Sequence, residues 1–254
     1  MTLLLQFLSL SDRYERKARL LPGLLVAATP ALTIGAVVHG FGPWYEAAGL
    51  ALTCEFLTAF VIGQLARARA KRQEDDLWKA WGGPPTTRWL RPWDETCSDQ
   101  QKTKWRGAIK RLTGIVIPAS VPEGKTQADV DRVIGDATRQ LRYVLRSRPE
   151  SSLLTTHNED YGFARNLLAV RWLGVFVAGT CLVACGIAFA FGIHPYPGLA
   201  AALVGTLVAL LVARELPEYV RRCSERYAES LFATAILVDG TAPSGGIPTS
   251  TPQG

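Results

Sequence analysis

The sequence is poor in the residues that build metal centres and disulfide frameworks. Its 254 residues include five cysteines, three histidines and one methionine. The cysteines show no C-x-x-C spacing and their number is odd, which argues against both a zinc site and a disulfide-stapled secreted domain. The composition also excludes a disordered chain and a collagen-like chain. We therefore expect neither a metal ion nor a cofactor.

Sequence motifs of common catalytic sites are missing as well. The chain contains no G-x-S-x-G, no H-E-x-x-H, no G-x-G-x-x-G and no G-x-x-x-x-G-K-[ST] phosphate loop. The polar cluster at 157–160 stands just before a segment that reads as a helix, where N-capping explains it better than catalysis does. The sequence therefore predicts a protein that is not an enzyme.

Apolar and charged residues are segregated along the chain. Hydrophobic residues make up 48% of it, and its mean hydropathy is +0.11. Residues 20–38 carry no charge, residues 47–65 carry only Glu55, and residues 172–213 carry none but are interrupted by H-P-Y-P-G at 194–198. About 20 apolar residues in a helix cross the hydrocarbon core of a bilayer. We predict an all-α membrane protein with four transmembrane helices, arranged as two hairpins around a cytoplasmic helical domain; buried helices of a soluble core are the alternative.

The charges that flank these spans predict their orientation. The turns 39–46 and 192–197 contain no Lys or Arg. Basic residues cluster instead before the first span, after the second, before the third and after the fourth: Arg13, Arg16, Lys17, Arg19, Arg67, Arg69, Lys71, Arg72, Arg165, Arg171, Arg214, Arg221, Arg222 and Arg226. By the positive-inside rule, both termini and the middle of the chain lie in the cytoplasm.

The spans divide the chain into six segments. They are an N-terminal amphipathic and basic cytoplasmic segment (1–19), a transmembrane hairpin (20–65), a basic cytoplasmic helical domain (66–171), a second transmembrane hairpin (172–213), a cytoplasmic amphipathic helix (214–238) and a flexible tail (239–254). Residues 3–10 either lie on the membrane or plug a groove.

Within the middle domain, the sequence predicts helices over 66–81, 98–113 and 126–148. The last of these has a capping box at its start and apolar residues at helical spacing. Residues 115–117 form either a short strand or an apolar linker. A further helix begins near Thr156 and continues into the third span.

Two basic features of the middle domain point to an anionic ligand. Residues 66–171 contain 20 basic and 13 acidic residues, a net charge of +7. The arginines of helix 126–148 line one side, where they either bind an anion or form a solvated face near anionic lipid. The Trp-rich stretch 78–93 is a platform for nucleobases with arginine on the phosphates, a belt at the lipid headgroups, or domain core. The candidate ligand-binding residues are Trp78, Trp81, Trp89, Arg88, Arg91, Arg132, Arg139, Arg142 and Arg146.

Polar residues inside the predicted spans are the candidates for a pore. Glu55 stands near the middle of the second span, where a charged side chain costs about 2.5–3.5 kcal/mol. It either lines or gates a pore, or stays neutral and hydrogen-bonded to a threonine. Thr58, Thr180 and Thr206 either bond to the backbone or line a wet path. Small residues in the third and fourth spans allow helices to approach closely, so we also expect a homo-oligomer.

Two segments carry a resemblance to a known class of proteins. They are DRYERKARLLPGLL (12–25), which enters the first span, and HNEDYGFARNLLAVRWLG (157–174), which enters the third. Together with the overall layout, they resemble the small multi-span, pore-forming membrane effectors of bacterial anti-phage defence, of the CBASS and Hailong kind. No functional residue is carried over from this resemblance.

The resemblance implies a multi-pass protein of the bacterial inner (plasma) membrane. Such a protein forms an oligomeric channel gated by a nucleotide or short oligonucleotide, made by a nucleotidyltransferase of the same operon, and depolarises the membrane. A non-conducting membrane anchor or scaffold that recruits a cytoplasmic partner is the alternative.

Overall fold

The structure is a computed structural model, and it describes residues 16–38, 66, 69–146 and 148–241. Over these residues the fold is helical and contains no strand, which confirms the all-α part of the fold prediction. The chain divides into two compact units. Unit 1 comprises Met1–Gly82 and Thr156–Arg226, and unit 2 comprises Gly83–Thr155 and Tyr227–Gly254.

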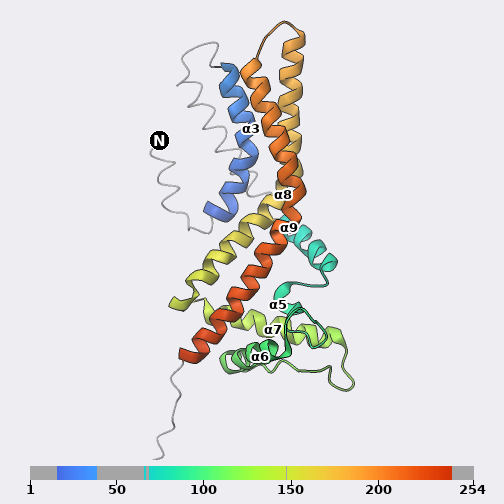
Figure 1. The fold of residues 1–254 in the computed structure, drawn as a ribbon, viewed down its shortest axis with the longest axis vertical. Helices are drawn as coiled ribbons and strands as arrows, with labels where there is room; N and C mark the ends of the chain where they lie inside the picture. Colours follow the sequence, from blue (N-terminus) through green and yellow to red (C-terminus); the bar gives the residue numbers. More distant parts are fainter. Residues whose placement is uncertain (1–15, 39–65, 67–68, 147, 242–254) are drawn as a thin grey trace, which may run out of the picture. The chain divides into compact units, whose positions relative to one another are not determined.

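Unit 1 is built mainly from three apolar helices. A π-helical turn, η1 (Arg16–Leu20), leads into α3 (Leu21–Val38). Helix α8 (Ser152–Ala190) and helix α9 (Tyr196–Thr241) enter this unit with most of their length. A short connection at 191–195 joins α8 to α9, at the place where the sequence predicts the second outward turn (Figure 1).

Helices α8 and α9 are each long and apolar enough to cross a membrane. Their large apolar side chains face outward: Phe176 is 72% exposed and Leu211 is 64% exposed. The first predicted span corresponds to α3, which is apolar but has only 18 residues. The second predicted span, the first turn, and residues 3–10 lie outside the described residues.

Close packing between α3 and α9 depends on two glycines of α9. A Cβ atom on Gly205 would lie 2.4 Å from the Cγ2 of Thr29, and one on Gly198 would lie 2.5 Å from the Cγ2 of Val37. At these two positions, small residues of the fourth span therefore allow two helices of the same chain to approach closely. This is a different use from the contact between subunits that the sequence suggested for Gly205.

The apolar core of unit 1 lies where α8 and α9 pack together. Ala164 and Leu168 of α8 join Leu216, Val220 and Cys223 of α9 in this cluster. The amphipathic helix predicted at 214–238 is not a separate element, because α9 continues without a break from the apolar fourth span. It also extends three residues into the predicted tail, ending at Thr241.

Unit 2 is a small helical domain. Its elements are α5 (Pro85–Arg88), α6 (Asp99–Thr113), α7 (Gln127–Leu145), the 3-10 turn η2 (Pro149–Ser151), the first residues of α8, and the end of α9. The predictions of helices near 98–113 and 126–148 are confirmed. The linker interpretation holds for 115–117, which are extended without strand pairing to a described residue.

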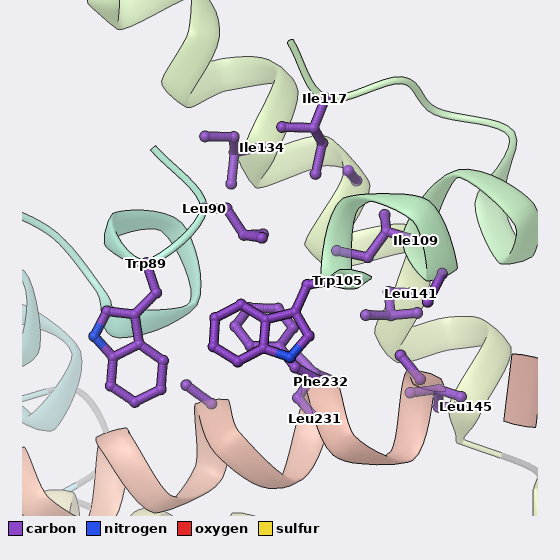
Figure 2. Close-up of a cluster of buried hydrophobic side chains, with 14 of the residues drawn as sticks. Trp89, Leu90, Trp105, Ile109, Ile117, Ile134, Leu141, Leu145, Leu231 and Phe232 are labelled. Carbon is purple, nitrogen blue, oxygen red and sulfur yellow. The ribbon is translucent and has the colours of Figure 1, made fainter. Parts of the chain in front are cut away.

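The core of unit 2 collects apolar side chains from α6, α7 and α9, and from Trp89 and Leu90 in the turn that follows α5 (Figure 2). Trp105 of α6 lies at its centre, with its ring centroid 4.6 Å from that of Phe232 and 6.2 Å from that of Trp89. Ile134 and Leu141 contribute the apolar stripe of α7 and are fully buried. This stripe fixes which side of α7 faces outward.

Candidate functional site

The beginning of α7 is held by a complete capping box. The Thr126 hydroxyl accepts a hydrogen bond from the backbone N–H of Asp129 at 3.2 Å, and the Asp129 carboxylate accepts one from the backbone N–H of Thr126 at 2.9 Å. These bonds satisfy backbone donors that would otherwise lack partners in the first helical turn. The cap and the buried apolar stripe together leave the arginine side of α7 in solvent.

Three of the predicted arginines line one hollow on this exposed side. Arg139, Arg142 and Arg146 surround it together with Tyr143, and its volume is about 290 Å³. Arg139 pairs with Asp136 at 3.6 Å, whereas Arg142 and Arg146 make no ion pair with any described residue. Like charges three or four positions apart on a helix repel each other, so an anion in the hollow would relieve this repulsion.

The sequence analysis did not select Tyr143, which is the aromatic member of this hollow. Its side chain is 67% exposed, although it is a large hydrophobic group on a helix whose other face is buried. An exposed aromatic ring beside guanidinium groups offers a flat face to a base and cations to a phosphate. Its position one residue from Arg142 was the signal that could have identified it.

Arg132 does not belong to the hollow. It lies about two turns nearer the start of α7 than Arg139 and pairs with Asp129 of the capping box, with 3.2 Å between Nη1 and Oδ1. Since the Arg132 side chain is 73% exposed, this pair adds little to stability.

The Trp- and Arg-rich stretch is divided between the two units. Trp89 is 5% exposed and belongs to the core of unit 2, where its indole faces Trp105 (Figure 2). Arg88 pairs with Asp94 at 3.5 Å, and Arg91 forms two hydrogen bonds to Asp131, at 2.7 and 2.8 Å. The geometry favours the core interpretation for Trp89 and gives both arginines a structural partner within unit 2.

The other two tryptophans lie in unit 1. Trp78 is half-buried, and the ammonium of Lys71 lies 4.7 Å from its ring centroid. Trp81 packs against the apolar core of unit 1. The five candidates of this stretch therefore do not form a single surface on either unit.

The pore candidates fall into two groups. Glu55 and Thr58 lie outside the described residues. Thr180 donates its hydroxyl to the carbonyl of Phe176 at 2.9 Å, and Thr206 donates to the carbonyl of Ala202 at 2.7 Å. These bonds within each helix are one of the two alternatives foreseen for threonines in a span, and they allow both side chains to face lipid.

A buried carboxylate in unit 1 was missed by the sequence analysis. Glu74 is 3% exposed, accepts a hydrogen bond from the Tyr161 hydroxyl, and accepts others from Arg165 at 3.2 and 3.3 Å. Burial, followed by the charge of Glu74, raises the pKa of Tyr161 above its usual range, so the phenol stays protonated and donates. This network ties the helix at 69–80 to α8 within unit 1.

One further segment ends in Gly-Lys-Thr directly before α7. Residues 119–126 read ASVPEGKT and differ from the phosphate-loop consensus by Ala119 in place of its first glycine. The described residues before it form no strand, and Asp129 already occupies the N-terminal turn of α7 with a carboxylate. The context of a phosphate loop is therefore missing, and the segment acts as the N-terminal cap of α7.

No group of three His, Cys, Asp or Glu side chains is placed for metal binding within the described part of the chain. The comparisons with known proteins add no assignment: no family model, no curated protein and no solved structure matches this chain. The cationic hollow on α7 is therefore the candidate site that the geometry defines.

Proposed function

We propose that this protein is an inner-membrane effector whose basic unit 2 binds an anionic, nucleotide-type ligand. In this proposal, four transmembrane helices cross the membrane as two hairpins, with both termini in the cytoplasm. Copies of the chain assemble into a pore, and ligand binding controls it. Opening depolarises the membrane in anti-phage defence.

The observation that carries the proposal is the hollow on α7. It brings together Arg139, Arg142, Tyr143 and Arg146, two of them without an ion-pair partner among the described residues. Guanidinium groups bind phosphate with two parallel hydrogen bonds, and an aromatic ring stacks on a base. A nucleotide or short oligonucleotide presents both groups together.

The membrane part of the proposal is supported by the exposed apolar surface of α8 and α9. Many exposed apolar side chains along two helices are unfavourable in water and favourable in hydrocarbon. Helix α9 also contributes residues to both units, since Leu216 lies in the core of unit 1 and Phe232 in the core of unit 2. One continuous helix therefore contributes side chains to both cores.

A non-conducting membrane anchor is the second candidate function. Thr180 and Thr206 favour it, because each hydroxyl donates a hydrogen bond to a backbone carbonyl of its own helix. Neither hydroxyl therefore needs water from a pore as a partner. An anchor would still use the hollow on α7, but for a phosphorylated or acidic partner. The two candidates differ in one observable, the ion flux that follows ligand binding.

The test uses the full chain reconstituted in liposomes that hold a fluorescent ion indicator. A panel of cyclic and linear oligonucleotides is added on the side of unit 2, at low and high salt. We expect one ligand class to bind, to bind more weakly as salt rises, and to trigger ion flux. Binding without flux would support the anchor, and no binding at low salt would contradict both candidates.

The matched variants separate the hollow from general charge. Arg142→Gln with Arg146→Gln should lower affinity at least about tenfold, because two charge-assisted contacts to phosphate are lost. Lys104→Gln with Lys110→Gln removes the same charge from α6 and should leave affinity within about twofold at physiological salt. Equal losses in both pairs would mean that no defined site exists on α7.

A further inference from the structure

A second cationic hollow lies in unit 1, where the charged parts of α8 and α9 meet their apolar parts. Arg171 and Trp172 of α8 and Leu211, Arg214 and Pro217 of α9 line it, and its volume is about 570 Å³. Its lining combines apolar side chains with those of two arginines. This combination differs from the hollow on α7, which has no aliphatic wall.

Arg171 is the better placed of the two cations. Its guanidinium lies 5.4 Å from the ring centroid of Trp172, and its Nε is buried without a hydrogen-bond partner among the described residues. A buried donor without a partner is costly, so an anion beside this guanidinium would be favourable. Arg214 is 84% exposed and lies 3.7 Å from Glu215, an exposed pair that contributes little and leaves the arginine able to bind an anion.

A proline of α9 leaves one backbone carbonyl beside the same hollow without its helical donor. Pro217 stands inside α9 and has no N–H group, so it cannot donate the helical hydrogen bond that would reach the carbonyl of Ala213. Both Ala213 and Pro217 line the hollow. A hydroxyl or ammonium group of a ligand could supply the missing donor.

An apolar groove begins at the same residues and runs along the helices. It is lined by parts of α3, α8 and α9, extends from Ala213 to Ala201, and has a volume of about 380 Å³. Arg171 and Ala213 line both the groove and the cationic hollow. At 1.5 Å per residue, the groove covers about 18 Å of α9, close to the roughly 15 Å of hydrocarbon in one leaflet.

We infer that these two connected cavities bind one glycerophospholipid with a net negative headgroup. Its phosphate lies between Arg171 and Arg214, its headgroup donor reaches the Ala213 carbonyl, and one acyl chain lies in the groove. A soluble anion would explain the arginines alone, and a fatty chain would explain the groove alone. The inference rests on the membrane assignment of α8 and α9 in the proposed function, and it is independent of the hollow on α7.

The test is native mass spectrometry of the full chain in detergent, with phosphatidylglycerol and phosphatidylcholine of identical acyl chains added in equal amounts. We expect the wild type to retain phosphatidylglycerol in preference to phosphatidylcholine. Arg171→Gln with Arg214→Gln should reduce the retained phosphatidylglycerol at least about tenfold. The charge-matched control is Arg221→Gln with Arg222→Gln, two arginines of α9 that pair with Glu225 and Glu218 outside both cavities.

A second pair of variants tests the groove without touching the charges. Ala209→Phe fills the groove and should reduce retention, whereas Leu207→Phe enlarges an exposed neighbour on α9 and should not. Millimolar inorganic phosphate is the competing probe. It should not displace the lipid, because the acyl chain supplies part of the binding.

The outcomes decide between the sources of the phosphate. Displacement of the lipid by inorganic phosphate, or retention unaffected by Ala209→Phe, would overturn the lipid site in favour of a free-anion site. Equal loss in the Arg221→Gln, Arg222→Gln double variant would overturn it in favour of general charge attraction. Release of the protein from membranes by carbonate would instead contradict the proposed function, so the two failures are distinguishable.

Discussion

Units 1 and 2 differ in how far their large apolar side chains are exposed. In unit 2, Ile109, Ile134 and Phe232 are fully buried, as in a domain that folds in water. In unit 1, Phe176 is 72% exposed and Phe191 is 81% exposed. The driving force for unit 2 is burial of apolar surface away from water, whereas α8 and α9 keep large apolar side chains exposed and are long and apolar enough to cross a membrane.

The two units also differ in the charges that they bury. Unit 2 buries the ammonium of Lys102, which is 2% exposed and donates to the carbonyl of Asp94. Unit 1 buries the Glu74 carboxylate and satisfies it with Tyr161 and Arg165. A buried charge of this kind is costly to leave unpaired, so it fixes how the helices around it pack.

The largest expected effect is on the core of unit 2. Trp105→Ala removes the ring at its centre and should lower the free energy of unfolding of unit 2 by about 3–5 kcal/mol. Hydrogen exchange measured by mass spectrometry on the full chain should show faster exchange in α6 and α7 and little change in α8 between 175 and 190. Val116→Ala, at an exposed position, is the control. Equal acceleration in the apolar part of α8 would mean that the two units unfold as one.

The next effect separates a membrane helix from an exposed helix of a soluble protein. Phe176→Arg places a charge on the outer face of α8, which costs about 2.5–3.5 kcal/mol at the centre of a membrane helix. We expect the full chain to lose resistance to carbonate extraction from membranes. Val121→Arg, in an exposed loop of unit 2, should leave extraction unchanged. Unchanged extraction of the Phe176 variant would indicate that α8 does not face lipid.

A smaller effect is expected from the buried network of unit 1. Glu74→Gln keeps the side-chain size but removes the charge that Arg165 and Tyr161 share, and should lower stability by roughly 1–3 kcal/mol. Thermal unfolding in detergent micelles measures the loss. Asp75→Asn is the matched control, because that carboxylate is 48% exposed and, among the described residues, pairs with Lys71 at 3.3 Å. Equal losses of stability in the two variants would contradict the prediction that the buried Glu74 carboxylate stabilises unit 1 more than an exposed carboxylate does.

The smallest effect concerns the cap that positions the arginine side of α7. Thr126→Ala removes the side-chain half of the capping box and should lower the stability of unit 2 by about 1 kcal/mol. Circular dichroism of the full chain at several pH values follows the change.

The same variant should change the acid sensitivity of unit 2. Hydrogen bonds from the Thr126 backbone N–H and hydroxyl hold the pKa of Asp129 below its usual value of 3.8. The resulting stabilisation is present above about pH 4 and is lost as the pH falls through the lower folded-state pKa. Acid unfolding of the Thr126→Ala protein should therefore be less steep, and an unchanged slope would contradict this assignment.

Local sequence signals predicted the two long helices of unit 2, α6 and α7, but not the short helix α5. The capping box at Thr126 and the apolar spacing of α7 were sufficient to place Arg139, Arg142 and Arg146 on its outer side. Both signals act within a few residues of the chain, so no tertiary contact had to be known. The sequence also predicted that a helix beginning near Thr156 continues into the third span, because no proline interrupts this segment.

Long-range pairing could not be predicted in the same way. Arg91 meets Asp131 forty residues away, and Tyr161 meets Glu74 across 87 residues. The composition of the stretch made Trp89 and Arg91 candidates for binding a ligand. In the structure, Trp89 is buried in the core of unit 2 and Arg91 pairs with Asp131. The contact that Gly205 makes within the chain likewise depends on where α3 lies. The spacing of apolar residues along the sequence does not predict that position.

The central claim is that α8 and α9 cross the membrane while unit 2 stays in the cytoplasm. Single cysteines introduced as Ile193→Cys, in the connection between α8 and α9, and Lys125→Cys, just before α7, test it in a chain whose native cysteines are replaced. Both positions are exposed. The account predicts that a membrane-impermeant thiol reagent labels position 193 in intact cells and labels position 125 only after lysis. Labelling of position 125 in intact cells, or protection of position 193 until lysis, would contradict it.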